Sequence, residues 1–480
     1  MRTIVKFLLP ISLAFLYLSC FHPTSPEREN LPPNTTMANI PKDGDTLFAL
    51  VTLHWDGEDY DGYIVKYQYR YITYHLTKGD SIIKDWEETD KTSLTIPFES
   101  SDEINLQKFQ VRAVDNDGAV DPTPAEKVFY TLKATPPVTK ISYPSNNQTF
   151  FAIEQTTDWW RGILLTYKAK DQDGEVVEYA WSVDNGPWHW TPDTSTYIPP
   201  SEFKGPLEGE HTIKVISRDN TNLVDPIGDS IKIKLIIPKF DKDILIIDDT
   251  DEKNFPSGIK APDDSVDAFY SRVFGTTDQI DIAKGEIITR DIIGRYKLIV
   301  WHADDKPTIR PKAITQYTDT LKDYLSVGGN LLVSGWRIMR SFAWRQNFPA
   351  FFEPTSFVGE FLHVISVDET SIIGDFTLAA GAGSFNSISV DSVKLANVFP
   401  YYGKLGEIDL ILQRAGFARP IYTYQNQLNS QFWYYRGRVI GIVYYGTVYN
   451  VAVLGFPLYF MKEDEVKLFA NNLLLSFKIK

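Results

Sequence analysis

An internal repeat limits the folds that are open to this chain. Residues 36–135 contain the run LVTLHWDGEDYDGYIVKYQYRY, and residues 136–238 contain the similar run LLTYKAKDQDGEVVEYAWSVD. In each copy, a strand of alternating apolar and polar residues reaches an Asp-x-Asp-Gly turn, and a second alternating strand follows. Because side chains alternate between the two faces of a strand, this period of two predicts strands rather than helices. The repeat therefore predicts two consecutive β-rich domains of one fold.

Short strands broken by Gly, Pro and Asp are typical of β-sandwiches. The corner Val-Asp-Pro at 120–122 recurs at 224–226, and Pro136-Pro137 marks the joint between the two copies. The repeats resemble the fibronectin type III and immunoglobulin-like domains of bacterial surface proteins. We therefore expect two all-β sandwiches, over 36–135 and 136–238.

The Asp-x-Asp-Gly turns have two interpretations. Their residues are Asp59, Asp61 and Gly62 in the first copy and Asp171, Asp173 and Gly174 in the second. Clustered carboxylates suit Ca²⁺, but the twelve-residue EF-hand pattern is absent. Asp and Gly also favour tight turns without any ion. We assign no cofactor to the chain, with Ca²⁺ at these turns as the alternative.

The sequence pattern changes at residue 239. Apolar strands such as DILIIDDT and YKLIVWHADD alternate with amphipathic helices, one of which places Val266, Phe269, Tyr270, Val273 and Phe274 on a single face. Strands that are apolar on both faces predict a parallel sheet covered by helices on both sides. We expect a doubly wound α/β domain over 239–480, with an inserted, irregular region near 340–435.

The runs DILIIDDT, LIVWHADD, GGNLLVSGW and VAVLGFPLYF make this domain similar to class I glutamine amidotransferase-like folds, which are flavodoxin-like. That resemblance implies a nucleophilic cysteine on the turn after the third strand. Here the turn reads Ser334-Gly335-Trp336, and Cys20 is the only cysteine in the chain. Glutaminase activity is therefore not expected.

Ligands of open parallel sheets sit beyond the carboxyl ends of the strands. At that edge we predict a candidate ligand site made of Asp248, Asp249, His302, Asp304, Asp305, Ser334, Trp336 and Arg337. The same acids could instead cap the following helices. Ser334 with His302 or His363 would suit a hydrolase, but the Gly-x-Ser-x-Gly elbow is missing. Carboxylates together with His302 could also hold a divalent metal at this edge. We assign neither catalytic residues nor metal ligands.

Four tryptophans stand close together in the second repeat. Trp159, Trp160, Trp188 and Trp190 could form a platform on which sugar rings stack, or they could pack inside the sandwich.

The first 35 residues read as export and attachment signals. Arg2 and Lys6 precede an apolar run from Phe7 to Leu18, which predicts a signal peptide over 1–19. The run resembles a bacterial lipoprotein signal, which implies lipidation of Cys20. A Pro-rich, polar tether follows at 20–35. Cleavage would change the net charge from −14 to −16, which argues against nucleic acid as a partner.

We therefore expect an exported lipoprotein of the cell envelope, attached to a membrane through its lipid, on the outer membrane or the periplasmic face. In the leading hypothesis it is not an enzyme, and its α/β domain binds an envelope protein or glycan while the sandwiches act as spacers. The alternative is an extracytoplasmic hydrolase that acts on polysaccharide or peptide.

Overall fold

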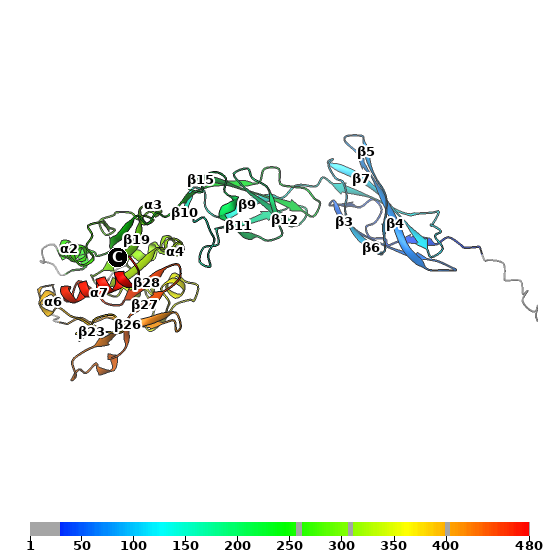
Figure 1. Cartoon of the computed structure of the whole chain (residues 1–480). Coiled ribbons are helices and arrows are strands. Elements are labelled where there is room, and N and C mark those ends of the chain that lie inside the picture. The colour runs from blue at the N-terminus through cyan, green and yellow to red at the C-terminus, as the bar shows by residue number, and fades with distance from the viewer. Residues whose placement is uncertain (1–28, 256–261, 306–310, 399–403, 480) are drawn as a thin grey trace, which may run out of the picture.

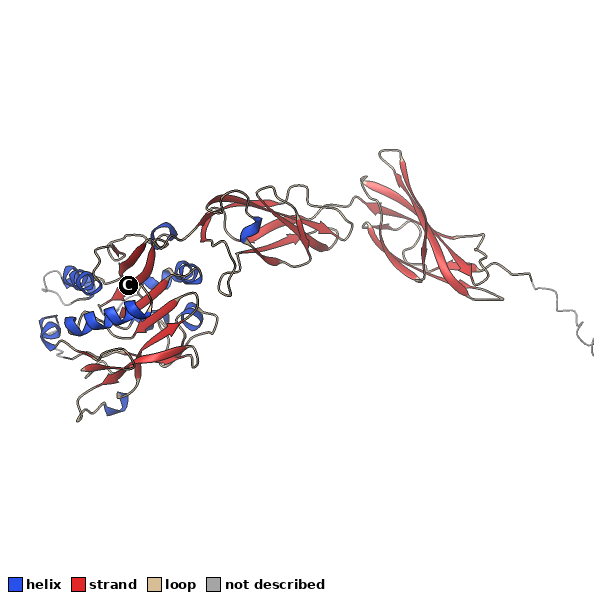
Figure 2. Cartoon of the chain, in the orientation of Figure 1, coloured by secondary structure: helices blue, strands red, loops and turns tan. Residues whose placement is uncertain are grey.

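A computed structural model describes residues 29–255, 262–305, 311–398 and 404–479. The predicted signal peptide and Cys20 lie outside these ranges. Figure 1 shows three domains in a row, with the C-terminal domain at one end and the first sandwich near the N-terminus. Helices are concentrated in the C-terminal domain (Figure 2). No helix of the described residues has both the length and the hydropathy to cross a bilayer.

The first domain is a sandwich of a three-stranded and a five-stranded sheet. The smaller sheet has the order β1 (Asn34–Met37), β3 (Leu50–Glu58), β6 (Ser93–Pro97). The larger has the order β2 (Thr46–Leu47), β8 (Ala125–Leu132), β7 (Ile104–Asp115), β4 (Ile64–His75), β5 (Ser81–Thr89). Alternate residues of β7, such as Phe109 and Val111, are fully buried in a core of this domain's own.

The second domain repeats that plan strand for strand. Its smaller sheet has the order β14 (Ser195–Ile198), β11 (Ile163–Lys170), β9 (Val138–Tyr143). Its larger sheet has the order β10 (Gln148–Phe151), β16 (Asp229–Ile236), β15 (Gly209–Asp219), β12 (Val176–Val183), β13 (His189–Thr191), and a short helix η1 (Pro200–Glu202) follows β14. The prediction of two similar sandwiches is confirmed.

A nine-stranded sheet forms the centre of the C-terminal domain. Its order is β18 (Gln279–Asp281), β17 (Lys242–Asp248), β19 (Tyr296–Ala303), β20 (Asn330–Gly335), β28 (Asn450–Leu454), β27 (Val439–Tyr445), β26 (Ala418–Gln425), β23 (Leu378–Gly381), β24 (Ile388–Ser389). The strands from β18 to β28 pair in parallel, and those from β28 to β24 pair antiparallel.

Helices lie on both faces of the parallel half. Ile244, Ile246 and Val300 pack with α2 (Pro262–Phe274) and α7 (Glu463–Ser476) on one face. Leu245, Trp301 and their neighbours pack on the other face with α3 (Arg290–Ile293), α4 (Thr318–Ser326) and α5 (Ile338–Phe342). The five apolar residues predicted on one face of α2 are all buried.

Two parts of the prediction for this domain were wrong, namely the irregular region near 340–435 and the parallel sheet. The segment is not irregular, because β21 (Ala350–Phe351), β22 (Val364–Glu369) and β25 (Asp409–Gln413) form a separate sheet, and β23, β24 and β26 extend the main one. The main sheet is also mixed, because β27 and β28 are joined by a loop too short for a parallel crossover. The remaining helices are η2 (Glu252–Asn254), η3 (Ala313–Gln316), η4 (Phe357–Phe361), α6 (Ser392–Val398) and η5 (Trp433–Tyr435).

One continuous apolar core joins the second sandwich to the C-terminal domain. Phe150, Phe151 and Trp160 belong to the same buried cluster as Trp301 and Tyr324. The rings of Trp159 and Tyr449 have centroids 5.0 Å apart and meet edge to face. Backbone bonds to Gly294 O from Lys239 N (2.8 Å) and Phe240 N (3.1 Å) reinforce the joint. The second sandwich is therefore packed against the C-terminal domain.

Candidate functional site

The carboxyl ends of β17 and β19 lie side by side at the predicted ligand edge. From β17 the chain passes to β18 on one side and then returns to β19 on the other. In open parallel sheets, ligands bind at such a change of direction. Asp248 pairs in register with His302 across the two strands.

Asp248, His302 and Asp304 meet in the interior, and none of them is exposed. His302 Nδ1 lies 3.4 Å from Asp248 Oδ1 and 3.2 Å from Asp304 Oδ2. Asp304 Oδ1 accepts a bond from the backbone N–H of Tyr459 (2.9 Å), which fixes its orientation. The imidazole stacks on the Tyr270 ring at 3.7 Å between centroids.

Charge and burial act against each other in this group. Burial lowers the pKa of His302, but attraction to Asp248 and the hydrogen bond with Asp304 outweigh it, so that the pKa is raised. Burial raises the pKa of Asp248 to about 8, and the nearby His302 only partly opposes that rise.

Three further carboxylates lie beside Asp248. Asp263 and Asp267 come from the first turns of α2, and Asp281 ends β18. One oxygen from each of these four residues lies within 4.8 Å of the others, and we call the four the acidic cluster. Asp248, Asp267 and one ring nitrogen of His302 satisfy the same limit.

Asp249 and Lys312 line a separate, small pocket of about 200 Å³. Asp249 Oδ2 accepts bonds from Trp301 Nε1 (3.2 Å) and from the backbone N–H of Ile314 (3.1 Å). The second bond satisfies a backbone amide of η3, which is not the helix that follows Asp249 in the chain. Asp305 forms a buried ion pair with Lys312, whose ammonium also donates to Asp249 O at 3.0 Å.

The other three residues of the predicted edge bond to different parts of the domain and do not join the group around His302. They are Ser334, Trp336 and Arg337. Ser334 Oγ donates to Phe456 O (3.1 Å), and Trp336 Nε1 donates to Gly406 O (2.9 Å). Arg337 pairs with Glu369 (2.5 Å) and Glu407 (3.2 Å).

His363, the other candidate base, is hydrogen-bonded to the Tyr449 hydroxyl at 3.2 Å. No serine–histidine pair forms among the predicted residues that the structure describes, and the predicted edge does not converge on one open cleft.

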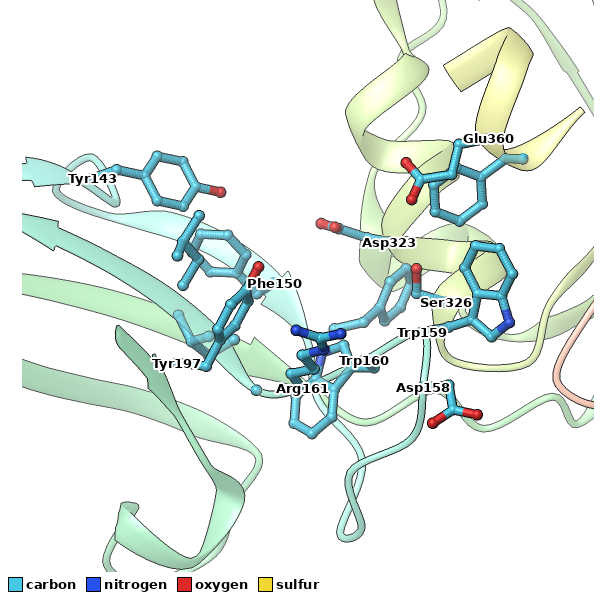
Figure 3. A pocket seen from close by; sticks show the side chains of 15 residues that line it. Tyr143, Phe150, Asp158, Trp159, Trp160, Arg161, Tyr197, Asp323, Ser326 and Glu360 are labelled. Atoms are coloured by element: carbon cyan, nitrogen blue, oxygen red, sulfur yellow. The ribbon is translucent and has the colours of Figure 1, made fainter. Parts of the chain in front are cut away.

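A larger cleft lies between the second sandwich and the C-terminal domain, and we call it the interdomain cleft. Its volume is about 410 Å³, within the range of about 300–1,000 Å³ that is usual for small-molecule sites. Figure 3 shows Tyr143, Phe150 and Tyr197 on the wall formed by the sandwich and Asp323, Ser326 and Glu360 on the opposite wall. Arg161 and Trp160 lie between the two walls (Figure 3).

The cleft combines aromatic faces with fixed polar groups. Arg290 holds Asp323 Oδ2 through Nε (2.9 Å) and Nη2 (2.5 Å). Burial and the nearby Asp323 raise the pKa of Tyr143, so its phenol stays protonated and can donate a hydrogen bond. Tyr197 is 46% exposed, so its ring is open to a ligand.

Comparisons with known proteins match only part of the chain. Searches of protein-family models and of curated proteins find no match. Among solved structures, the fibronectin(III)-like modules of Clostridium thermocellum CbhA match 42% of this chain and 95% of their own at 18% identity and a TM-score of 0.21. A bacterial ice-binding adhesin involved in host cell surface retention matches 46% and 73% at 9% identity and a TM-score of 0.17. The three N-terminal domains of the bacteriophage RB49 outer capsid protein Hoc match 45% and 64% at 16% identity and a TM-score of 0.18.

The order of the strands in each sheet characterises the two N-terminal domains better than the comparisons with solved structures do. In each domain the three-stranded sheet packs against a five-stranded sheet in the same sequence of strands. Both are fibronectin III/immunoglobulin-like sandwiches.

Sequence patterns predict only part of these sites. Trp159 and Trp160 were singled out, and they lie at the second fibronectin III-like domain's contact with the C-terminal domain. The other cleft residues are far apart in sequence and carry no shared motif. For the acidic cluster, the spacing of Asp263 and Asp267 was a usable signal, because residues four apart share one face of a helix.

Proposed function

We propose that the chain is an exported, lipid-anchored protein of the cell envelope that binds a glycan in the interdomain cleft without catalysis. The observation that carries this proposal is the cleft itself, where aromatic rings from the second sandwich face carboxylates from the C-terminal domain. Cys20 would supply the anchor, and the tether and the first sandwich would hold the cleft away from the membrane.

The chemistry of the cleft favours a carbohydrate over other small ligands. Pyranose rings have apolar C–H faces, which stack on exposed aromatic rings such as Tyr197 and Tyr143. Their hydroxyls donate to carboxylates, and Asp323 and Glu360 lie across the cleft from those rings. Clefts between domains are also common places for ligand sites.

We further infer that the C-terminal domain is a doubly wound α/β domain distantly similar to class I glutamine amidotransferases. The strand order β18-β17-β19-β20-β28 and the helices on both faces support this inference. Ser334, near the end of β20, stands where that family has a cysteine, and its hydroxyl is buried and bonded to Phe456 O. We therefore propose no catalytic role for Ser334.

Affinity electrophoresis tests the binding proposal. The mature protein is run through native gels that contain one of a panel of envelope and extracellular polysaccharides, and retardation gives a dissociation constant. Replacing Tyr197 with Ala removes one exposed ring from the cleft. An aromatic contact contributes about 0.5–1.5 kcal/mol, so the dissociation constant should rise about two- to thirteenfold.

The matched control is Trp188→Ala, which removes a ring that is 43% exposed on the same sandwich but outside the cleft. Binding should be unchanged in this control. Equal losses in the two variants, or no retardation by any polysaccharide, would contradict the proposal.

A further inference from the structure

The acidic cluster gathers carboxylates from separate elements at one end of the main sheet. Asp248 ends β17, Asp281 ends the adjacent β18, and Asp263 and Asp267 lie on one face of α2. One oxygen of each lies within 4.8 Å of the others. Like charges at this separation repel strongly, and a buried position increases the repulsion.

Two of these carboxylates are buried and have an oxygen without a partner. Asp248 is 0% exposed and Asp263 is 4% exposed. Asp248 Oδ2 and Asp263 Oδ1 accept no hydrogen bond from the part of the chain that the structure describes. Buried polar atoms are nearly always satisfied, so an unsatisfied carboxylate oxygen in a cluster indicates a missing partner. His302 Nε2 is buried and unsatisfied in the same sense, while Nδ1 of the same ring lies 3.4 Å from Asp248 Oδ1.

Protein cations balance only part of this charge. Lys284 lies 3.1 Å from Asp263 Oδ2 and 2.7 Å from Asp281 Oδ2. Its side chain is 58% exposed, so it approaches from the solvent and is free to move away. A single ammonium cannot compensate the four carboxylates once all of them are ionised.

We propose that the acidic cluster binds a hard divalent cation, of the class of Mg²⁺, Ca²⁺ and Mn²⁺. Carboxylate oxygens are the ligands that these ions prefer. Asp248 and Asp267 are the central ligands, because they belong to both groups whose ligand atoms converge. Asp263, Asp281 and His302 complete the ligand set from the two sides.

The ion would satisfy the orphaned oxygens that Lys284 does not reach. It would also tie α2 to the ends of β17 and β18, since its ligands come from all three elements. Cation binding should therefore stabilise this domain against unfolding in proportion to the cation concentration.

Titration with Mn²⁺ tests the site directly. The mature protein is freed of metal with a chelator, and free Mn²⁺ is followed by electron paramagnetic resonance. We expect one equivalent to bind, and Mg²⁺ or Ca²⁺ to displace it. Asp267→Asn should weaken Mn²⁺ binding by about tenfold or more, because it removes a central carboxylate that is only half-buried. Asp264→Asn makes the same charge change on the same helix at an exposed position outside the cluster, and it should leave binding unchanged.

Thermal unfolding provides a second readout that is independent of the ligand titration. Millimolar Mg²⁺, Ca²⁺ or Mn²⁺ should raise the Tm of the wild-type protein and of the Asp264→Asn variant. Asp248→Asn removes a central ligand, so it should abolish the rise in Tm with cations. Failure of the wild-type protein to bind Mn²⁺, or equal binding by Asp267→Asn and the wild type, would overturn the proposal and leave Lys284 as the cluster's counter-ion.

Discussion

His363 gives the C-terminal domain a specific sensitivity to acid. The residue is fully buried, and its ring centroid lies 3.9 Å from that of Tyr444. Its Nε2 shares a hydrogen bond with the Tyr449 hydroxyl, with 3.2 Å between the two atoms. Burial and the positive charge of Arg414 lower the pKa of His363 from 6.5 to about 4.

The sign and size of the effect follow from this shift. Between about pH 6.5 and pH 4 the unfolded chain binds a proton at this position and the folded chain does not, so acid favours unfolding. Stability from the neutral ring is fully present above pH 6.5 and is lost as the pH falls through about 4. At about 1.4 kcal/mol per pKa unit, the full loss is about 3 kcal/mol.

Urea unfolding of the mature protein at several pH values between 7 and 4 measures this loss, with far-UV circular dichroism as the probe. His363→Asn is the comparison variant, because Asn does not titrate here and tolerates the left-handed backbone that His363 adopts (φ 56°). The free energy of unfolding of the wild type should fall more steeply with acid than that of the variant, by up to about 3 kcal/mol at pH 4. Parallel pH profiles for the two proteins would refute the reasoning.

Two further predictions concern the contact between the second sandwich and the C-terminal domain, and the membrane anchor. Trp159→Ala removes the ring that packs on Phe361 and Tyr449, so it should lower the free energy of unfolding by about 2–3 kcal/mol and separate the melting of the second sandwich from that of the C-terminal domain in calorimetry. A single unchanged transition would show that the joint does not depend on this ring. Cys20→Ala should move the exported protein from the membrane fraction to the soluble fraction of the envelope; continued membrane association would show that another segment anchors it.

The spacing of apolar residues predicted secondary structure correctly where that structure depends on the local sequence alone. The spacing of Val266, Phe269 and Tyr270 predicted the buried face of α2, because a helix repeats every 3.6 residues. The alternation of apolar and polar residues around the two Asp-x-Asp-Gly turns predicted the sandwiches, because successive side chains of a strand point to opposite faces.

The sequence did not predict features that depend on contacts between segments far apart in the chain. Arg337 follows β20 at the predicted ligand edge, but its guanidinium pairs with Glu369 and Glu407, which come from a distant segment. The antiparallel half of the main sheet depends on which strand β27 pairs with, and local patterns do not specify that. The interdomain cleft forms where two domains pack together, so no local sequence motif predicts it.

Hydrogen–deuterium exchange tests the central claim most directly, because it reports where a bound glycan lies. The mature protein is compared with and without a polysaccharide from the panel that retards it in native gels. The account predicts slower exchange in the segments that line the cleft from both domains, at 158–164 and 360–361. Slower exchange around the exposed Trp188 and Trp190 of β13 instead, with the cleft segments unchanged, would contradict it.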